Sequence, residues 1–275
     1  MLVTSWHEGP REIWVEGIQT NNEQPIRFKA GKLILAAGAI NTAKIVLKAY
    51  QDYRTTLPLL DNPTLQIPFI LPSSLGHRLE IDAFGLVALN LIWESMPFNC
   101  VVQGTILELT SLMRADFFAD LPFSAAANLA LIRYLSPAML GLQLFFPGSI
   151  QRPSRLSLMK NGHIHIQGQP NTIDIKKMKG LLRYFRILGA WSHPLLVRKV
   201  PTGYGIHYAG TLPLRSMPAK QYECDSFGRL YGSHHVFIAD SSGFPVLPAK
   251  NMSFTMMANA MRIADYVTRE LRKHL

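Results

Sequence analysis

The chain has 275 residues, of which 48% are hydrophobic and 17% are charged, and its net charge is +10. This length and composition allow a sizeable core in one large domain or two smaller ones, which excludes global disorder. The excess of Lys and Arg over Asp and Glu is compatible with binding to an anionic ligand, a membrane surface or nucleic acid. The positive residues are scattered, however, and no zinc-finger spacing or RNP-like aromatic run accompanies them, so we expect no nucleic-acid partner.

The two cysteines and the N-terminal residues indicate which metal or disulfide chemistry and which cellular compartment to expect. Cys100 and Cys224 lie far apart, so they form no disulfide framework, and no Cys or His spacing indicates a metal site. The start of the chain, "MLVTSWHEGPREIW", lacks the basic segment and the long apolar core of a signal peptide. We therefore expect a reducing, cytoplasmic location and no metal.

The first fifty residues predict strands followed by a helix. "EIWVEGIQT" (12–20) and "PIRFKAGKLILAAGA" (25–39) alternate as strands do, and the polar turn "NNEQ" links them. The run Leu33–Ala37 is typical of a strand buried in a parallel sheet. In "GAINTAKIVLKAY", Asn41 or Thr42 can cap a helix. Such a helix start favours an anionic group because its amide hydrogens are free.

The middle of the chain contains a hairpin and a basic helix. "RLSLMKNGHIHIQG" (155–168) predicts a hairpin that turns at Asn161-Gly162. His163 and His165 share one side of its second strand. They could form a metal pair, but with no third ligand nearby we favour an exposed polar face. "NTIDIKKMKGLLRYFRILGAW" (171–191) predicts an amphipathic helix whose lysines and arginines form a solvated face.

A long apolar stretch from Leu121 to Gln151 has Arg133 as its single charge. Prolines and a glycine interrupt it, so no piece reaches the roughly 18 unbroken apolar residues that span a bilayer. We expect buried helices or the wall of an apolar pocket here. The alternative is that this stretch contacts a membrane surface.

The last 75 residues predict a short strand, a loop and a long helix. The apolar run Val236–Ala239 ends in Asp240, and the proline-containing loop "SSGFPVLPAK" follows. "NMSFTMMANAMRIADYVTRELRKHL" (251–275) has the spacing of an amphipathic helix. We expect its apolar stripe to face the core: Met257, Met261, Ala264, Val267 and Leu271.

Three segments together resemble the glucose-methanol-choline (GMC) flavoprotein oxidoreductases. "LILAAGAINTAKIVL" resembles their strand–turn–helix, and "HYAGT" (207–211) is similar to their His-x-x-Gly-Thr segment. The end of the chain resembles their C-terminal signature, in which a strand ends in Ala-Asp, a Phe-Pro loop follows, and a helix carries an Asn and a Thr near its start. The matching residues here are Asp240, Phe244-Pro245, Asn251 and Thr255.

The resemblance implies a mixed α/β fold and an FAD-dependent oxidation of an alcohol. Part of a Rossmann-like FAD-binding domain would comprise residues 1–50 and 201–275. Residues 51–200 would form a substrate domain with an antiparallel sheet packed by helices. His207 would act as the catalytic base beside the flavin, and Asn251 would hold the substrate hydroxyl. The implied cofactor contacts are Gly38, Ala39, Asp240, Ser241, Met252 and Thr255.

The sequence also departs from the family pattern. The family often has Asn-Pro at the catalytic position, where this chain has Asn251-Met252, preceded by Lys250. The Gly-x-Gly-x-x-Gly loop that cradles the cofactor phosphates is not present. One hypothesis is therefore an enzyme that acts with a missing N-terminal FAD-binding half as partner. The alternatives are a non-catalytic remnant or binding module of the same fold, and a peripheral membrane-associated protein.

Overall fold

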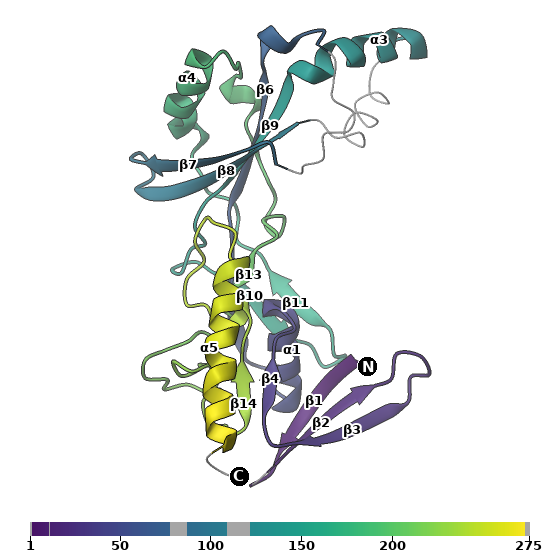
Figure 1. Cartoon of the computed structure of the whole chain (residues 1–275), viewed down its shortest axis with the longest axis vertical. Helices are drawn as coiled ribbons and strands as arrows, with labels where there is room; N and C mark the ends of the chain where they lie inside the picture. The colour runs from purple at the N-terminus through teal and green to yellow at the C-terminus, as the bar shows by residue number, and fades with distance from the viewer. Residues whose placement is uncertain (1, 11, 78–86, 109–121, 273–275) are drawn as a thin grey trace. The chain divides into compact units, whose positions relative to one another are not determined.

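The computed structural model describes residues 2–10, 12–77, 87–108 and 122–272 and divides the chain into two compact units (Figure 1). Unit 1 contains residues 1–62, 148–169 and 205–275, and unit 2 contains residues 63–147 and 170–204. The predicted boundaries, after residues 50 and 200, differ from this division. The segment 148–169 belongs to unit 1 because its strand β10 (Ser154–Leu158) pairs with β5 (Thr56–Asp61).

The N-terminal part of unit 1 forms a three-stranded antiparallel sheet, and the next strand of the chain belongs to a different sheet. The strands β1 (Leu2–Glu8), β2 (Ile13–Ile18) and β3 (Pro25–Ala30) pair in sequence order. The single strand expected over 25–39 is wrong, because the chain turns at Gly31 and Lys32. The next strand, β4 (Leu33–Leu35), instead pairs in parallel with β14 (Val236–Ile238).

Helix α1 (Ala39–Ala49) begins after a three-residue turn that follows β4, and its N-cap is Gly38 at φ +84°. This is earlier than the caps expected at Asn41 or Thr42. The Thr42 hydroxyl instead lies inside the first turn and accepts a hydrogen bond from the Ala37 N–H at 3.0 Å. The apolar side of α1, including Ile45 and Val46, is buried in the main core of unit 1.

A second sheet of unit 1 has the order β11-β10-β5-β13, with β11 at Ile164–Gln167 and β13 at Tyr208–Ala209. The hairpin of β10 and β11 is confirmed, and Gly162 takes φ +80° in its turn. His163 and His165 are both exposed, as expected of a polar strand face. No group of three potential metal ligands occurs within the described part of the chain.

The C-terminal helix α5 (Ser253–Arg272) follows the short 3-10 turn η5 (Ser241–Gly243) and runs alongside β14 (Figure 1). Ile263 and Val267 pack against Phe237 of β14. Of the stripe expected to face the core, only Val267 is buried, and the expectation is wrong for the other four residues, which are exposed: Met257, Met261, Ala264 and Leu271. The core contacts only one side of α5, and no other described segment covers the methionine side.

Unit 2 is an antiparallel sheet with helices. Its strand order is β12 (Arg198–Lys199), β6 (Thr64–Ile70), β9 (Met139–Phe145), β8 (Cys100–Glu108) and β7 (Leu89–Ser95). Helix α4 (Lys179–Ile187) packs Leu181, Leu182 and Phe185 into a core with the sheet residues. The 3-10 turns are η1 (Pro72–Ser74), η2 (Ser136–Ala138), η3 (Ile175–Met178) and η4 (Pro194–Leu196).

Helix α3 (Ala125–Leu135) lies within the apolar stretch 121–151. The expectation of buried helices is wrong for α3, since only Asn128 and Ile132 of its residues are buried. The expected start of the stretch, Leu121, lies outside the described residues. None of the described helices is long and apolar enough to cross a membrane.

Candidate functional site

Three of the predicted site segments meet in unit 1. Alternate N–H groups along 210–214 donate to the carbonyls of 241–243, at N–O distances of 3.1, 2.9 and 2.7 Å. The hydroxyl of Thr211 donates to the carbonyl oxygen of Ala39 at 2.9 Å. The segment after His207, the turn after Asp240 and the start of α1 therefore lie together, although far apart in the sequence.

The side chain of Asp240 links two of these segments. One carboxylate oxygen accepts hydrogen bonds from the Gly38 N–H at 2.8 Å and from the Thr42 hydroxyl at 2.5 Å. The other accepts from the N–H of Ser242 at 2.9 Å and from its hydroxyl. Asp240 is only 7% exposed. Its carboxylate therefore fixes the turn before α1 against η5, and a cofactor contact at this residue would have to use the backbone.

The turn before α1 is the part of the site where a dinucleotide cofactor could bind. A Cβ built on Gly38 would meet no atom within 4 Å, and Ala36 and Ala37 are exposed, so the turn is open on one side. Among the described residues, no hydrogen-bond partner is found for the N–H groups of Ala39 and Ser241, although both residues are buried. Free N–H groups at a helix start favour phosphate, so the open turn fits the phosphate-bearing part of such a cofactor.

His207 stands directly before β13 at the end of a strained turn. Ile206 takes φ +56°, a region that a β-branched residue rarely adopts. A Cβ on Gly205 would lie 2.5 Å from the carbonyl oxygen of Asn62, so only glycine fits there. The His207 ring is half-buried with its Nδ1 atom enclosed, and this burial lowers the pKa of the imidazole. The neutral form, which can accept a proton, is therefore favoured near pH 7.

The start of α5 lies against the same part of unit 1. Met252 accepts the first helical hydrogen bond, from the Met256 N–H at 2.8 Å, and its side chain belongs to one buried cluster with Ala209 and Phe244. Asn251 and Lys250 are exposed, and so is Thr255 in the first turn of α5. His207 and Asn251 each stand within two residues of this cluster.

The sequence missed two contributors to this arrangement. Thr42 was expected as a helix cap but binds the Asp240 carboxylate, and Thr211 holds the His-x-x-Gly-Thr segment to α1. Thr211 is fully buried, and a buried hydroxyl requires a partner, but both its burial and its partner depend on the fold.

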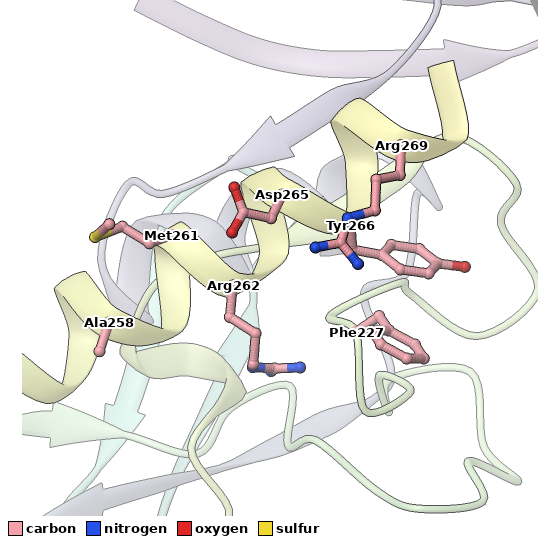
Figure 2. A pocket seen from close by; sticks show the side chains of 7 residues that line it. All are labelled: Phe227, Ala258, Met261, Arg262, Asp265, Tyr266 and Arg269. Atoms are coloured by element: carbon pink, nitrogen blue, oxygen red, sulfur yellow. The ribbon is translucent and has the colours of Figure 1, made fainter. Parts of the chain in front are cut away.

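A cavity of about 440 Å³ lies elsewhere in unit 1, along the solvent side of α5. Figure 2 shows the side chains that line it: Phe227, Ala258, Met261, Arg262, Asp265, Tyr266 and Arg269. The rings of Phe227 and Tyr266 stack at 4.1 Å between centroids. None of the predicted site residues lines this cavity.

Comparison with known proteins gives one family and several similar folds. Residues 196–260 match the GMC oxidoreductase family. No curated protein matches the sequence. Formate oxidase from Aspergillus oryzae has 13% identity and a TM-score of 0.66, over 99% of this chain and 60% of that enzyme. An FAD-dependent oxidoreductase from Chaetomium thermophilum has 17% identity and a TM-score of 0.59, over 98% and 61% of the two chains.

A third structure, pyridoxine 4-oxidase from Mesorbium loti, has 15% identity and a TM-score of 0.57, over 97% of this chain and 57% of that chain. The chain thus spans about 60% of the length of the enzymes that it matches. The mixed α/β fold class predicted from the sequence is confirmed. Residues 196–260 thus match the GMC oxidoreductase family, and the whole chain shares the fold of the C-terminal part of these similar enzymes.

Proposed function

We propose that this chain contributes the catalytic segments of an FAD-dependent enzyme that oxidises an alcohol CH–OH group by hydride transfer to the flavin. The convergence of the His207 segment, the Asp240 turn and the start of α5 supports this proposal most directly. FAD agrees with the FAD-dependent oxidoreductase among the structural matches. When bound, the flavin accepts the hydride, and the protein supplies orientation and electrostatics.

His207 is the proposed base that takes the proton of the substrate hydroxyl. Hydride leaves the carbon more readily when the attached oxygen is losing its proton. The lowered pKa keeps the imidazole neutral and ready to accept that proton. The strained turn at Ile206 and the close approach at Gly205 hold the backbone before His207 in one conformation.

Asn251 is the proposed group that orients the hydroxyl. Its amide can donate a hydrogen bond to an alkoxide-like oxygen without competing for the proton. The buried Met252 anchors its backbone in the cluster that contains Ala209. The N-terminus of α5 would favour negative charge beside Met252 and Thr255.

The residues proposed to hold FAD are Gly38 and Ala39 at the open turn, with Met252 and Thr255 at the start of α5. Asp240 and Ser241 would contribute through their backbone, because hydrogen bonds to the chain itself occupy the Asp240 carboxylate. No Gly-x-Gly-x-x-Gly loop is present in the sequence. We therefore propose an N-terminal FAD-binding half as the partner that completes the cofactor site.

The open edge of the parallel sheet supports this partner. Within the described residues β4 pairs with β14 alone, and Ile34 of β4 is exposed. Parallel strands are normally covered on both faces, and two strands alone are marginal in water. A further strand from a FAD-binding half would pair with this edge, and a segment of the same half packed on the sheet face would cover Ile34.

The test uses the chain co-expressed with an N-terminal half that carries the Gly-x-Gly-x-x-Gly loop. Flavin absorbance of the purified complex and turnover of a panel of primary alcohols are measured. His207→Ala and Asn251→Ala should each lower turnover by roughly 100-fold or more while the flavin stays bound. The exposed His165→Ala serves as the matched control and should retain turnover.

Two results would contradict the proposal. Unchanged turnover in both site variants would remove the roles given to His207 and Asn251. A complex that binds flavin but oxidises no alcohol of the panel would favour the alternative, a non-catalytic remnant or binding module of the same fold.

A further inference from the structure

Helix α4 of unit 2 exposes an apolar side that the sheet does not cover. Its core side is buried through Leu181, Leu182 and Phe185. On another side, Tyr184, Ile187 and Leu188 follow one another at i, i+3 and i+4 and are 70%, 74% and 75% exposed. An amphipathic helix that only covers its own sheet would place polar residues at these positions.

The exposed apolar residues continue beyond the helix. Trp191 is held beside β6 by two backbone hydrogen bonds with Ile70, of 2.7 and 2.8 Å, so its exposed ring stands on a fixed backbone. We call the following set of exposed residues, which lies within residues 184–196, the α4 surface: Tyr184, Ile187, Leu188, Trp191, Leu195 and Leu196. Monomeric soluble proteins rarely expose so many large apolar side chains in one short segment without a binding role.

Cations surround this apolar set. Seven exposed Lys and Arg residues occur between residues 176 and 199, whereas Asp174 is the only acidic residue between 170 and 200: Lys176, Lys177, Lys179, Arg183, Arg186, Arg198 and Lys199. Within the described part of the chain none of these cations forms an ion pair. Lys177 donates to the Pro97 carbonyl oxygen at 2.9 Å, and the charge of the other six cations is available to an anionic partner.

The basic residues of α4 also form a stripe of their own. Lys179, Arg183 and Arg186 are spaced at i, i+4 and i+7, so they share one side of the helix. The guanidinium of Arg186 lies 5.0 Å from the centre of the Trp191 ring, which joins this stripe to the apolar residues. The helix therefore has three sides: one for the core, one apolar and exposed, and one basic.

We propose that the α4 surface docks on the face of an anionic lipid bilayer, with α4 in the plane of the interface. Its exposed aliphatic residues would enter the boundary between headgroups and acyl chains, with Tyr184 and Trp191 at headgroup level. The cations would contact the acidic headgroups. A nucleic acid would satisfy the cations, but it would leave aliphatic residues such as Ile187 and Leu195 without a contact that favours them.

This proposal goes beyond the oxidoreductase function and does not depend on it. It also places the membrane contact in a different segment from the one that the sequence suggested. That hypothesis placed the contact in the stretch 121–151, whose described part carries the single cation Arg133.

The test is co-sedimentation of the purified chain with vesicles of phosphatidylcholine alone or with about 30% phosphatidylserine. We expect binding to the anionic vesicles at low salt and its loss at high salt. Arg183→Glu with Arg186→Glu should lower partitioning at least about tenfold, since each cation near the surface contributes about fivefold. Ile187→Ser with Leu195→Ser should lower it about tenfold as well.

Matched controls lie on unit 1. The charge control is Arg152→Glu with Lys160→Glu, and the apolar control is Met217→Ser, at positions that are all exposed. These variants should change partitioning less than about threefold. Circular dichroism of every variant checks that the fold is retained.

Three results would overturn the proposal. The first is equal partitioning of the α4 variants and the unchanged chain. The second is self-association that the α4 variants abolish, with no binding to anionic vesicles, because the surface would then contact a second copy. The third is quenching of tryptophan fluorescence by brominated lipid that Trp191→Phe leaves unchanged, because a different tryptophan would then lie at the bilayer.

Discussion

Asp240 and Asn251 stand near each other in the sequence, yet their surroundings are opposite. Asp240 is buried, and hydrogen bonds from α1 and η5 occupy both of its carboxylate oxygens. Asn251 is exposed, as are its neighbour Lys250 and Thr255 beyond it. One side of the candidate site is therefore fixed by contacts within the chain. The other side is anchored through Met252 and Met256, and its polar groups are available to a cofactor or substrate.

The largest effect on stability is expected at the fixed side. Asp240→Ala leaves the Gly38 N–H and the donors of Thr42 and Ser242 without their acceptor, which should lower the free energy of unfolding by about 3 kcal/mol or more. Chemical denaturation measures this change. The exposed Asp265→Ala is the control, and an equal loss in both variants would contradict the role given to Asp240.

Gly210→Ala should have the second-largest effect. Gly210 takes φ +77°, and an added Cβ would lie 2.8 Å from Leu60 and 3.1 Å from the carbonyl oxygen of Phe244. Backbone strain and crowding together should cost about 2–3 kcal/mol. Gly232→Ala measures the backbone strain without the crowding, because Gly232 has φ +79° and open space around it. This substitution should cost only about 1 kcal/mol. Equal melting temperatures of the two variants would show that the crowding is absent.

His207 should add a smaller, pH-dependent effect. Burial lowers its pKa in the folded chain below the ordinary 6.5, so the unfolded chain binds more protons as the pH falls below that value. Stability should therefore be unaffected above pH 6.5 and should decrease as the pH falls toward the lowered pKa. Denaturation at pH 7.5 and pH 5.5 should show a larger loss in the unchanged chain than in His207→Gln. An identical loss would mean that the ring is solvated.

The smallest effect on stability is expected at the exposed side. Asn251→Ala and Thr255→Ala should each change the free energy of unfolding by less than about 0.5 kcal/mol, as at other exposed positions. Thermal unfolding of the two variants tests this. A loss above about 1 kcal/mol in either would show that the start of α5 is as constrained as the Asp240 turn.

Local patterns predicted the elements that depend on local chemistry. The Asn161-Gly162 turn fixed the hairpin of β10 and β11, and the apolar run at Leu33 identified a strand that does pair in parallel. The segments 207–211 and 240–251 were placed in one site by their resemblance to a family, and the structure brings their backbones together. The site roles of these residues stay predictions.

The errors arise where the answer depends on distant partners. The amphipathic pattern of α5 shows that one side is apolar, but it does not show which segment covers that side, so Met257 and Met261 were wrongly expected in the core. The bend at Gly31 separates two strands that read as one. The cap of α1 was misplaced because Thr42 bonds to Asp240, nearly two hundred residues away in the sequence.

One edge of β4 has no strand partner among the described residues, which has a consequence for handling the protein. A strand that presents free N–H and C=O groups beside the exposed Ile34 is a template for pairing between copies. Natural sheets blunt such edges with charge, proline, a covering segment or a very short strand, and β4 itself has only the last of these, its three-residue length. In β4 itself, Leu33–Leu35, all three residues are apolar. Aggregation during expression of this chain alone would therefore begin at this edge, and it would fall when a complementing strand is supplied.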